Sequence, residues 1–288
     1  MTTIHQELSA ASEGLAQVGV DTPRLDAELL LAHVLGVSRA QLVIRAHEQA
    51  SADVRTRYLA LLTRRTKREP IAYILRRRDF RRISLAVDER VLIPRPETEL
   101  LVDVGLALPA GAHVLDVGTG SGAVALALKD ERPDLIVAGV DVSAGALSVA
   151  RLNASRLRLD VAFWRTDLMQ ELDGGAAAYD RAFPGPASFA CDAVLANLPY
   201  VAADELLMPE VALYEPSTAL LGGGEDGLDL VRRLLSQLGP RAEIKLVALE
   251  TGATQAALVS ELVALAGFEQ LERLRDLAGH ERVVVGRR

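Results

Sequence analysis

The stretch VLDVGTGSGAVALALK, residues 114–129, decides the fold. The apolar run that ends at Val117 is typical of a buried strand, and the apolar residues after Gly122 predict a helix. Between the two lie Gly118 and Gly120, where glycines let the chain turn sharply and let a ligand approach the backbone beside the positive end of a helix. The stretch therefore predicts a strand, a ligand-binding loop and a helix, in that order.

The same alternation of apolar runs and helix-like segments continues along the chain. The predicted strands cover residues 112–118, 135–141, 161–164, 191–197 and 244–250. This order predicts an α/β fold with a mostly parallel, doubly wound, Rossmann-like sheet. The last apolar run, residues 282–287, follows a polar turn without a crossover helix, so we expect it to pair antiparallel with an edge strand.

The first part of the chain is predicted to be a small helical bundle. Thr22-Pro23 is a typical helix start and Gly36 a typical stop, while Ser51 can cap a long helix that should end near Pro70. The predicted organisation is a helical domain at 1–75, a linker with a short strand pair at 76–96, and a domain with the alternating strands and helices at 97–288. The strand pair is expected within residues 83–93, where apolar residues alternate.

Composition limits the class of protein. The chain has 288 residues, of which 50% are hydrophobic and 25% charged, as expected for a soluble globular protein. Its one cysteine, Cys191, excludes an intramolecular disulfide and opens an apolar run, so we expect a buried structural thiol. The acidic N-terminus does not resemble a signal peptide, and no run approaches the roughly 20 apolar residues of a membrane span. We expect a cytoplasmic monomer.

Charge is distributed unevenly. The net charge is −7, yet residues 55–82 hold eleven Lys and Arg against Glu69 and Asp79, a local balance of +9 that leaves −16 for the rest. Such a stretch can contact RNA or an acidic protein, or it can be a solvated helical face. Residues 173–188 are compositionally loose and predict an exposed insertion.

A nucleoside cofactor is predicted beside the glycine loop. Asp141 ends the second strand, where a carboxylate can accept hydrogen bonds from both ribose hydroxyls. The chain has neither a pyrophosphate cradle nor a second nucleotide-binding half, which favours S-adenosylmethionine over a dinucleotide. Asp167 can then hold the adenine amino group while Leu168 covers the ring, although Asp167 is also a plausible helix cap.

A second site is predicted at the end of the strand 191–197, where Asn197, Leu198, Pro199 and Tyr200 follow each other. An amide or aromatic amine nitrogen is a poor nucleophile, and two acceptors for its N–H groups would hold it in line with a methyl donor. The side-chain oxygen of Asn197 and the carbonyl of Leu198 can be those acceptors, with Tyr200 flat against the planar group. In isolation the same residues are also typical of a turn.

Together with longer motifs, these residues resemble a known family. The motifs are DAELLLAHVLG at 26–36, VLIPRPETELLVD at 91–103 and PEVALYEPSTALLGGGEDGLDLVRRL at 209–234. The chain resembles the bacterial release factor glutamine methyltransferases, which methylate the side-chain amide of the glutamine in the Gly-Gly-Gln loop of peptide chain release factors. In that family a helical N-terminal domain engages the release factor and the C-terminal domain transfers the methyl group.

The resemblance implies roles for particular residues of this sequence. It implies that S-adenosylmethionine is bound by Gly118, Thr119, Gly120, Ser121, Gly122, Asp141, Asp167, Leu168 and Asn197. It implies that the glutamine is held by Asn197, Leu198, Pro199 and Tyr200, with Arg95, Pro96, Glu97 and Thr98 near the pocket as its floor or lid.

Two positions depart from the family pattern. Leu198 replaces a proline, which keeps the carbonyl acceptor but loses the rigidity of one ring. Arg76 replaces a glycine, and if that glycine needs a positive φ, Arg76 must strain the link or change the turn. Asn-Leu-Pro-Tyr also occurs in ribosomal RNA adenine dimethyltransferases, so N6-adenine methylation of RNA is the main alternative, although those enzymes carry their extra helices after the sheet. A non-catalytic protein that binds the ribosome or a release factor is a further alternative.

Overall fold

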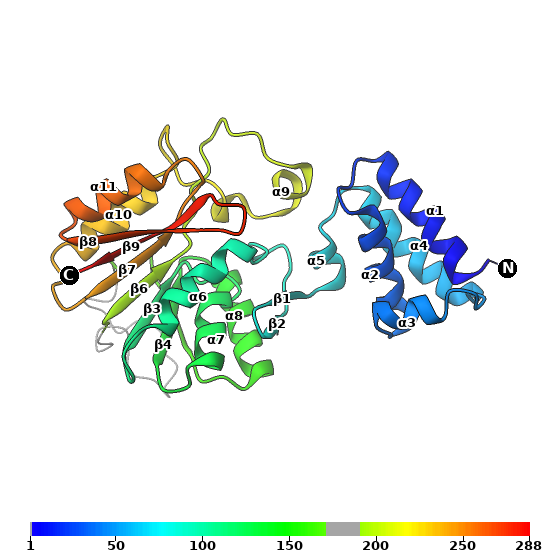
Figure 1. Ribbon diagram of the computed structural model, residues 1–288, viewed down its shortest axis with the longest axis horizontal. Coiled ribbons are helices and arrows are strands. Elements are labelled where there is room, and N and C mark those ends of the chain that lie inside the picture. Colours follow the sequence, from blue (N-terminus) through cyan, green and yellow to red (C-terminus); the bar gives the residue numbers. More distant parts are fainter. Residues whose placement is uncertain (1, 171–190) are drawn as a thin grey trace. The chain divides into compact units, whose positions relative to one another are not determined.

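The computed structural model describes residues 2–170 and 191–288, which divide into two compact units (Figure 1). One unit is helical and consists of Met1–Arg77 together with Leu207–Tyr214. The other consists of Arg78–Leu206 and Glu215–Arg288 and contains the large sheet. The loose segment 173–188 lies outside the described residues. No helix in the described ranges has both the length and the apolar character needed to cross a membrane.

The helices of the helical unit are α1 (Ile4–Gln17), α2 (Pro23–Leu35), α3 (Arg39–Ile44), α4 (Ala52–Thr66), α5 (Ile71–Leu75) and α9 (Pro209–Tyr214). Side chains cap the N-termini of three of them, α1, α3 and α4. As expected, Gly36 ends α2 in the left-handed conformation and the Ser51 hydroxyl caps α4 by accepting from the Val54 amide. Helix α4 ends at Thr66, a few residues before Pro70.

Arg76 occupies the left-handed position that ends α5, with φ of 55° and ψ of 31°. The turn that suits glycine is therefore kept, and the arginine adopts a backbone conformation that costs about 1–2 kcal/mol for a residue with a Cβ. Of the two possibilities raised by the sequence, strain at this position is the one observed.

Carboxylates neutralise much of the basic stretch 55–82. A buried ion pair joins Arg65 Nε to Asp26 Oδ2 at 2.6 Å, and Glu210 of α9 accepts from both Arg65 Nη2 at 3.0 Å and Arg68 Nη2 at 2.6 Å. Other residues of the stretch that pair with carboxylates are Arg55, Arg57, Arg64, Arg81 and Arg82. Much of the stretch is thus engaged in ion pairs within the protein, and its contact with RNA stays a prediction.

The sheet of the second unit has the order β5-β4-β3-β6-β7-β9-β8. Its strands are β3 (His113–Val117), β4 (Ile136–Asp141), β5 (Ala162–Arg165), β6 (Ala193–Ala196), β7 (Leu246–Glu250), β8 (Gln270–Arg275) and β9 (Glu281–Arg287). The first five are mutually parallel, and β9 pairs antiparallel with β7 and with the edge strand β8. The expected Rossmann-like sheet is confirmed.

Two details differ from the sequence prediction. The small strand pair is β1 (Arg78–Phe80) with β2 (Ile83–Leu85), so the pairing lies earlier than the expected 83–93. Strand β8 was not predicted because most of its side chains are exposed, which leaves no apolar run or alternation to detect. Its backbone pairing with β9 defines it instead.

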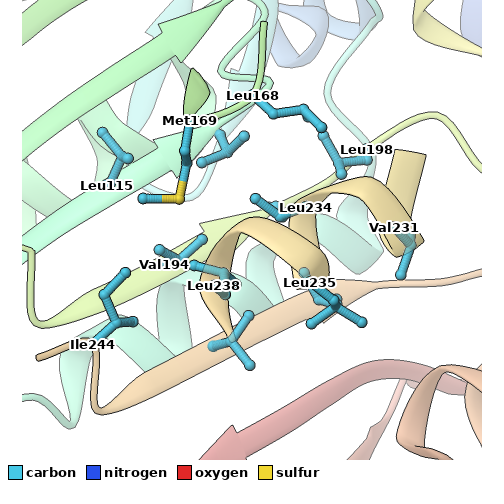
Figure 2. Close-up of a cluster of buried hydrophobic side chains, with 14 of the residues drawn as sticks. Leu115, Leu168, Met169, Val194, Leu198, Val231, Leu234, Leu235, Leu238 and Ile244 are labelled. Carbon is cyan, nitrogen blue, oxygen red and sulfur yellow. The ribbon is translucent and has the colours of Figure 1, made fainter. Parts of the chain in front are cut away.

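Helices cover both faces of the sheet (Figure 1). Helices α6 (Glu99–Leu106), α7 (Ala123–Glu131) and α8 (Ala144–Leu157) lie on one face, and α10 (Asp229–Leu238) and α11 (Ala256–Leu265) on the other. Leu234, Leu235 and Leu238 of α10 pack into a buried cluster with Val194 of β6 (Figure 2). Cys191 belongs to the same cluster, and burial raises the pKa of its thiol to about 12, so the expectation of a buried thiol is confirmed.

Strand order reverses direction between β3 and β6. From β3 the chain proceeds to β4 and β5 on one side, whereas β6 and β7 lie on the other. Ligands of open α/β sheets bind at the carboxyl ends of the strands at such a switch point. The glycine loop follows β3 and the Asn197–Tyr200 stretch follows β6, so the two predicted sites are neighbours.

Candidate active site

The glycine loop leads from β3 into α7 through three left-handed residues. The φ angles of Gly118, Gly120 and Gly122 are 75°, 56° and 82°, values that glycine adopts without strain. The amides of Gly118 and Thr119 both donate to the Val140 carbonyl at 2.9 Å, which ties the loop to the end of β4. Gly118, Thr119, Gly120 and Ser121 line a cavity of about 150 Å³.

Asp141 lies at the end of β4 and also lines this cavity. Its Oδ2 accepts from the Gly120 amide at 2.9 Å and its Oδ1 from the Ser143 amide at 2.8 Å. These bonds hold the carboxylate in place, and each oxygen keeps a lone pair for a further donor. The carboxylate therefore suits a pair of ribose hydroxyls, as the sequence predicts.

Asp116 is a lining residue that the sequence reading missed. It is 2% exposed, and its Oδ2 accepts from the Thr119 hydroxyl at 2.6 Å and from the Ala125 amide at 3.2 Å. Burial raises the pKa of its carboxyl to about 7. The available signal was its place two residues before the first glycine, at the end of a strand that is otherwise apolar.

Asp167 and Leu168 line the cavity on the side of β5. Asp167 Oδ2 accepts from Arg233 Nη2 at 2.5 Å, in a half-exposed pair. Leu168 is buried with a φ of 56°, a strained conformation for a leucine. Both residues are thus beside the cavity, which places them where an aromatic base can contact them.

Asn197, Leu198 and Pro199 line the cavity from the end of β6. Asn197 Nδ2 donates to Thr98 Oγ1 at 3.0 Å. Among the described residues, no hydrogen bond ends on Asn197 Oδ1 or on the Leu198 carbonyl. Both predicted acceptors are therefore open, which is the arrangement that a planar NH₂ group requires.

The Leu198 side chain is buried, at 4% exposure, in the hydrophobic cluster shown in Figure 2. It packs against the glycine loop, since a Cβ placed on Gly118 would lie 3.1 Å from Leu198 Cδ2. Packing therefore fixes the position of Leu198, in place of the ring of a proline.

Tyr200 lies beside the lining residues rather than among them. Burial first, and then the charge of Glu250, raise the pKa of its phenol to about 12, so the ring stays neutral. Its carbonyl accepts from Gln255 Nε2 at 2.9 Å. A Cβ on Gly227 would lie 2.2 Å from that carbonyl oxygen, and one on Gly222 would lie 2.5 Å from the Pro199 carbonyl oxygen. The Gly222–Gly227 loop thus supports the site through backbone packing, which the sequence reading did not anticipate.

Arg95, Pro96 and Glu97 do not line the cavity. Arg95 Nη2 donates instead to the buried carboxylate of Glu215 at 2.5 Å, whose other oxygen accepts from the Ile93 amide at 3.0 Å. From the same motif, Pro94 and Thr98 are the lining residues. The binding of substrate by Arg95, Pro96 and Glu97 stays a prediction.

Comparisons with known proteins agree with this geometry. Residues 6–75 match the family model described as PrmC N-terminal domain, and residues 96–181 match Methyltransferase small domain. A release factor glutamine methyltransferase of Rhodospirillum rubrum is 39% identical, over 95% of this chain and 82% of that protein. One from Burkholderia pseudomallei is 40% identical, over 100% of this chain and 99% of that protein.

The chain belongs to the release factor glutamine methyltransferase family. It is an S-adenosylmethionine-dependent methyltransferase, and the alternative of RNA N6-adenine methylation is not favoured.

Solved structures show the same fold at low sequence identity. The hMettl16 catalytic domain, in complex with a 3′UTR hairpin, has a TM-score of 0.53 and 14% identity over 79% of this chain and 81% of that one. Human methyltransferase 10 domain containing protein has a TM-score of 0.51 and 15% identity over 70% of this chain and 87% of that one. These likenesses concern the methyltransferase fold alone.

Proposed function

We propose that this member of the family methylates the side-chain amide nitrogen of the glutamine in the Gly-Gly-Gln loop of peptide chain release factors. The observation that carries the proposal is the pair of open acceptors, Asn197 Oδ1 and the Leu198 carbonyl, on the wall of the cavity behind the glycine loop. A primary amide has two N–H groups, so two fixed acceptors match it.

The residues around the cavity fit S-adenosylmethionine. Asp141 would accept from the ribose hydroxyls, Asp167 from the adenine amino group, and Leu168 would cover the adenine ring. The glycine loop lets backbone approach the ligand, and the carboxyl of Asp116 is a buried acidic group on the wall for the cationic part of the cofactor. When bound, the cofactor supplies an electrophilic methyl group on a sulfonium sulfur.

The protein's own contribution is to hold the amide nitrogen. Amide resonance withdraws its lone pair, and hydrogen bonds from both N–H groups to Asn197 and Leu198 would fix its direction and favour electron density on nitrogen. Tyr200 would limit rotation of the amide plane by packing against it. No strong base is needed, because the N–H proton becomes acidic only as the new N–C bond forms and can then leave to water.

The helical unit is proposed to engage the release factor, with the enzyme acting as a monomer. A cytoplasmic location suits the modification of a translation factor.

The test uses purified protein, S-adenosylmethionine labelled in its methyl group, and an intact release factor. We expect label on the factor and none on a matched factor whose loop glutamine is changed to alanine. Free ribosomal RNA serves as the competing substrate. Label on the RNA but not on the factor would overturn the protein-glutamine assignment and leave the methyltransferase assignment intact.

A further inference from the structure

One buried acid beside the site has no part in the reaction described so far. Glu250 ends β7 and is 2% exposed, and its neighbour in the sheet is the end of β6, where Leu249 is in register with Ala196. Glu250 Oε2 has no hydrogen-bond partner among the described residues. Burying a carboxyl group in this way is costly, which points to a use for it.

Thr98 connects this acid to Asn197. Thr98 is 4% exposed, and its hydroxyl oxygen accepts from Asn197 Nδ2 at 3.0 Å. The same hydroxyl is within reach of the Glu250 carboxyl, whose pKa it lowers against the larger effect of burial. The three residues therefore form a chain that runs from the end of β7 to the wall of the cavity.

The chemistry of these groups fixes the direction of each bond. A carboxylate only accepts, and a hydroxyl has one proton to give. When Glu250 is ionised, the Thr98 proton is therefore directed to Glu250, and the Thr98 oxygen faces Asn197 with lone pairs only. Asn197 can bond to the Thr98 oxygen only by donating from its NH₂ group. Its Oδ1 is therefore directed away from Thr98.

We propose that Glu250 is a positioning residue that acts through Thr98 to keep Asn197 Oδ1 directed at the substrate nitrogen, an inference that rests on the proposed function. If the Asn197 amide were reversed, its NH₂ group would face the NH₂ group of the substrate, donor against donor. The substrate nitrogen would then lose one of its two acceptors while the cavity for the cofactor stayed unchanged.

Three variants test the series of contacts from Glu250 through Thr98 to Asn197. Thr98→Val keeps the side-chain shape and removes the hydroxyl, Thr98→Ser keeps the hydroxyl and serves as the matched control, and Glu250→Gln keeps the shape and lets the partner of Thr98 donate as well as accept. We expect Thr98→Val to lower kcat for release factor methylation about a hundredfold, the scale of a misplaced reacting group. Thr98→Ser should recover most of the rate, and Glu250→Gln should fall between the two.

Cofactor affinity separates positioning from a folding defect. Calorimetric titration with S-adenosylmethionine should give all three variants a Kd within about twofold of the parent, because the glycine loop and Asp141 are left unchanged. A loss of kcat in Thr98→Val that is matched by an equal loss of cofactor affinity would overturn the positioning role. So would full activity in both Thr98→Val and Glu250→Gln.

A readout without substrate keeps this inference distinct from the proposed function. In NMR spectra of the protein, the Asn197 side-chain NH₂ pair should show one proton protected from solvent exchange, in the parent and in Thr98→Ser but not in Thr98→Val. If the parent fails to label the release factor yet shows this pattern, the substrate assignment fails and the orientation survives. If labelling succeeds but the exchange protection of the Asn197 NH₂ protons is the same in Thr98→Ser and Thr98→Val, the positioning role is wrong and the proposed function stands.

Discussion

Leu198 and Gly118 pack against each other, with Leu198 Cδ2 only 3.1 Å from the point that a Cβ on Gly118 would occupy. This contact joins the stretch that follows β6 to the loop that follows β3. A leucine at a position where the family has proline is thus held by its side chain, which is buried in the cluster shown in Figure 2.

Leu198→Pro is therefore expected to weaken the protein rather than improve it. The proline restores backbone rigidity, worth about 0.4–1 kcal/mol. It also removes much of a buried leucine side chain, for which Leu→Ala changes cost about 2–5 kcal/mol. Urea unfolding should show a net loss of stability, and kcat should not exceed that of the parent. Leu198→Met, which conserves volume, is the control, and a Leu198→Pro variant that is both stable and faster would contradict this account.

Arg76→Gly is expected to stabilise the helical unit. Arg76 has a φ of 55°, and glycine adopts this conformation without a Cβ clash, so the free energy of unfolding should rise by about 1 kcal/mol. Thermal unfolding measures the change. Arg76→Ala is the matched control, because it removes the same long side chain and keeps the strained Cβ. A gain of equal size in both variants would trace the effect to the side chain instead of the backbone.

Asn197→Ala is expected to abolish methyl transfer and leave cofactor binding within about tenfold, because only one acceptor for the substrate amide is removed. Single-turnover labelling and calorimetry measure the two quantities. An Asn197→Ala variant that transfers normally but no longer binds the cofactor would move Asn197 from substrate positioning to cofactor binding.

Gly227→Ala is expected to lower kcat strongly by displacing the backbone of Tyr200. A Cβ at this position would lie 2.2 Å from the Tyr200 carbonyl oxygen, so the two segments must separate. Gly111→Ala is the control, since Gly111 has a similar φ of 77° and nothing within 4 Å of a Cβ. Both variants lose stability from the backbone conformation, and only Gly227→Ala should lose rate at saturating substrates. Equal kcat values in the two would show that the Gly222–Gly227 loop does not support the site.

The rate at saturating substrates should fall as the pH drops below about 7. Burial, the largest cause, and the charge of Glu97 raise the pKa of Glu250 to about 7, against the opposing effects of the Thr98 hydrogen bond and of Arg282 and Arg95. Below that pH the neutral acid can donate to Thr98, which frees Thr98 to donate to Asn197 Oδ1 and reverses the amide. Above it the carboxylate keeps the productive direction.

Variants separate this effect from the titration of Asp116, whose pKa is also about 7. Glu250→Gln should give a low kcat that is nearly independent of pH between roughly 6 and 8, about one unit either side of the pKa of Glu250 in the parent. Asp116→Asn should keep the acid limb of kcat and change cofactor affinity instead. An acid limb that persists in Glu250→Gln would assign it to another group.

The parts of the site that follow a strand were predictable from sequence. Asp141 and Asn197 each come directly after an apolar run, and parallel strands bring their carboxyl ends to one edge. Asp116 and Glu250 were not, because both lie in strands that read as apolar. Thr98 was expected near the pocket, but its hydrogen bond with Asn197, 99 positions away, was not. Such contacts depend on which strands are neighbours, and no single segment of the sequence determines the strand order β3-β6-β7.

Helix α9 has a consequence for experiments that recombine members of the family. It belongs to the helical unit by its contacts, and its Glu210 is held by Arg65 and Arg68, yet it is encoded after the Asn197–Tyr200 stretch. A chimera that exchanges only the first 77 residues would leave Glu210 facing a foreign bundle, while the exchanged Arg65 and Arg68 would lose Glu210 as a partner. Transplanting the complete helical unit of one relative into another therefore requires two grafts, the N-terminal helices and residues 207–214.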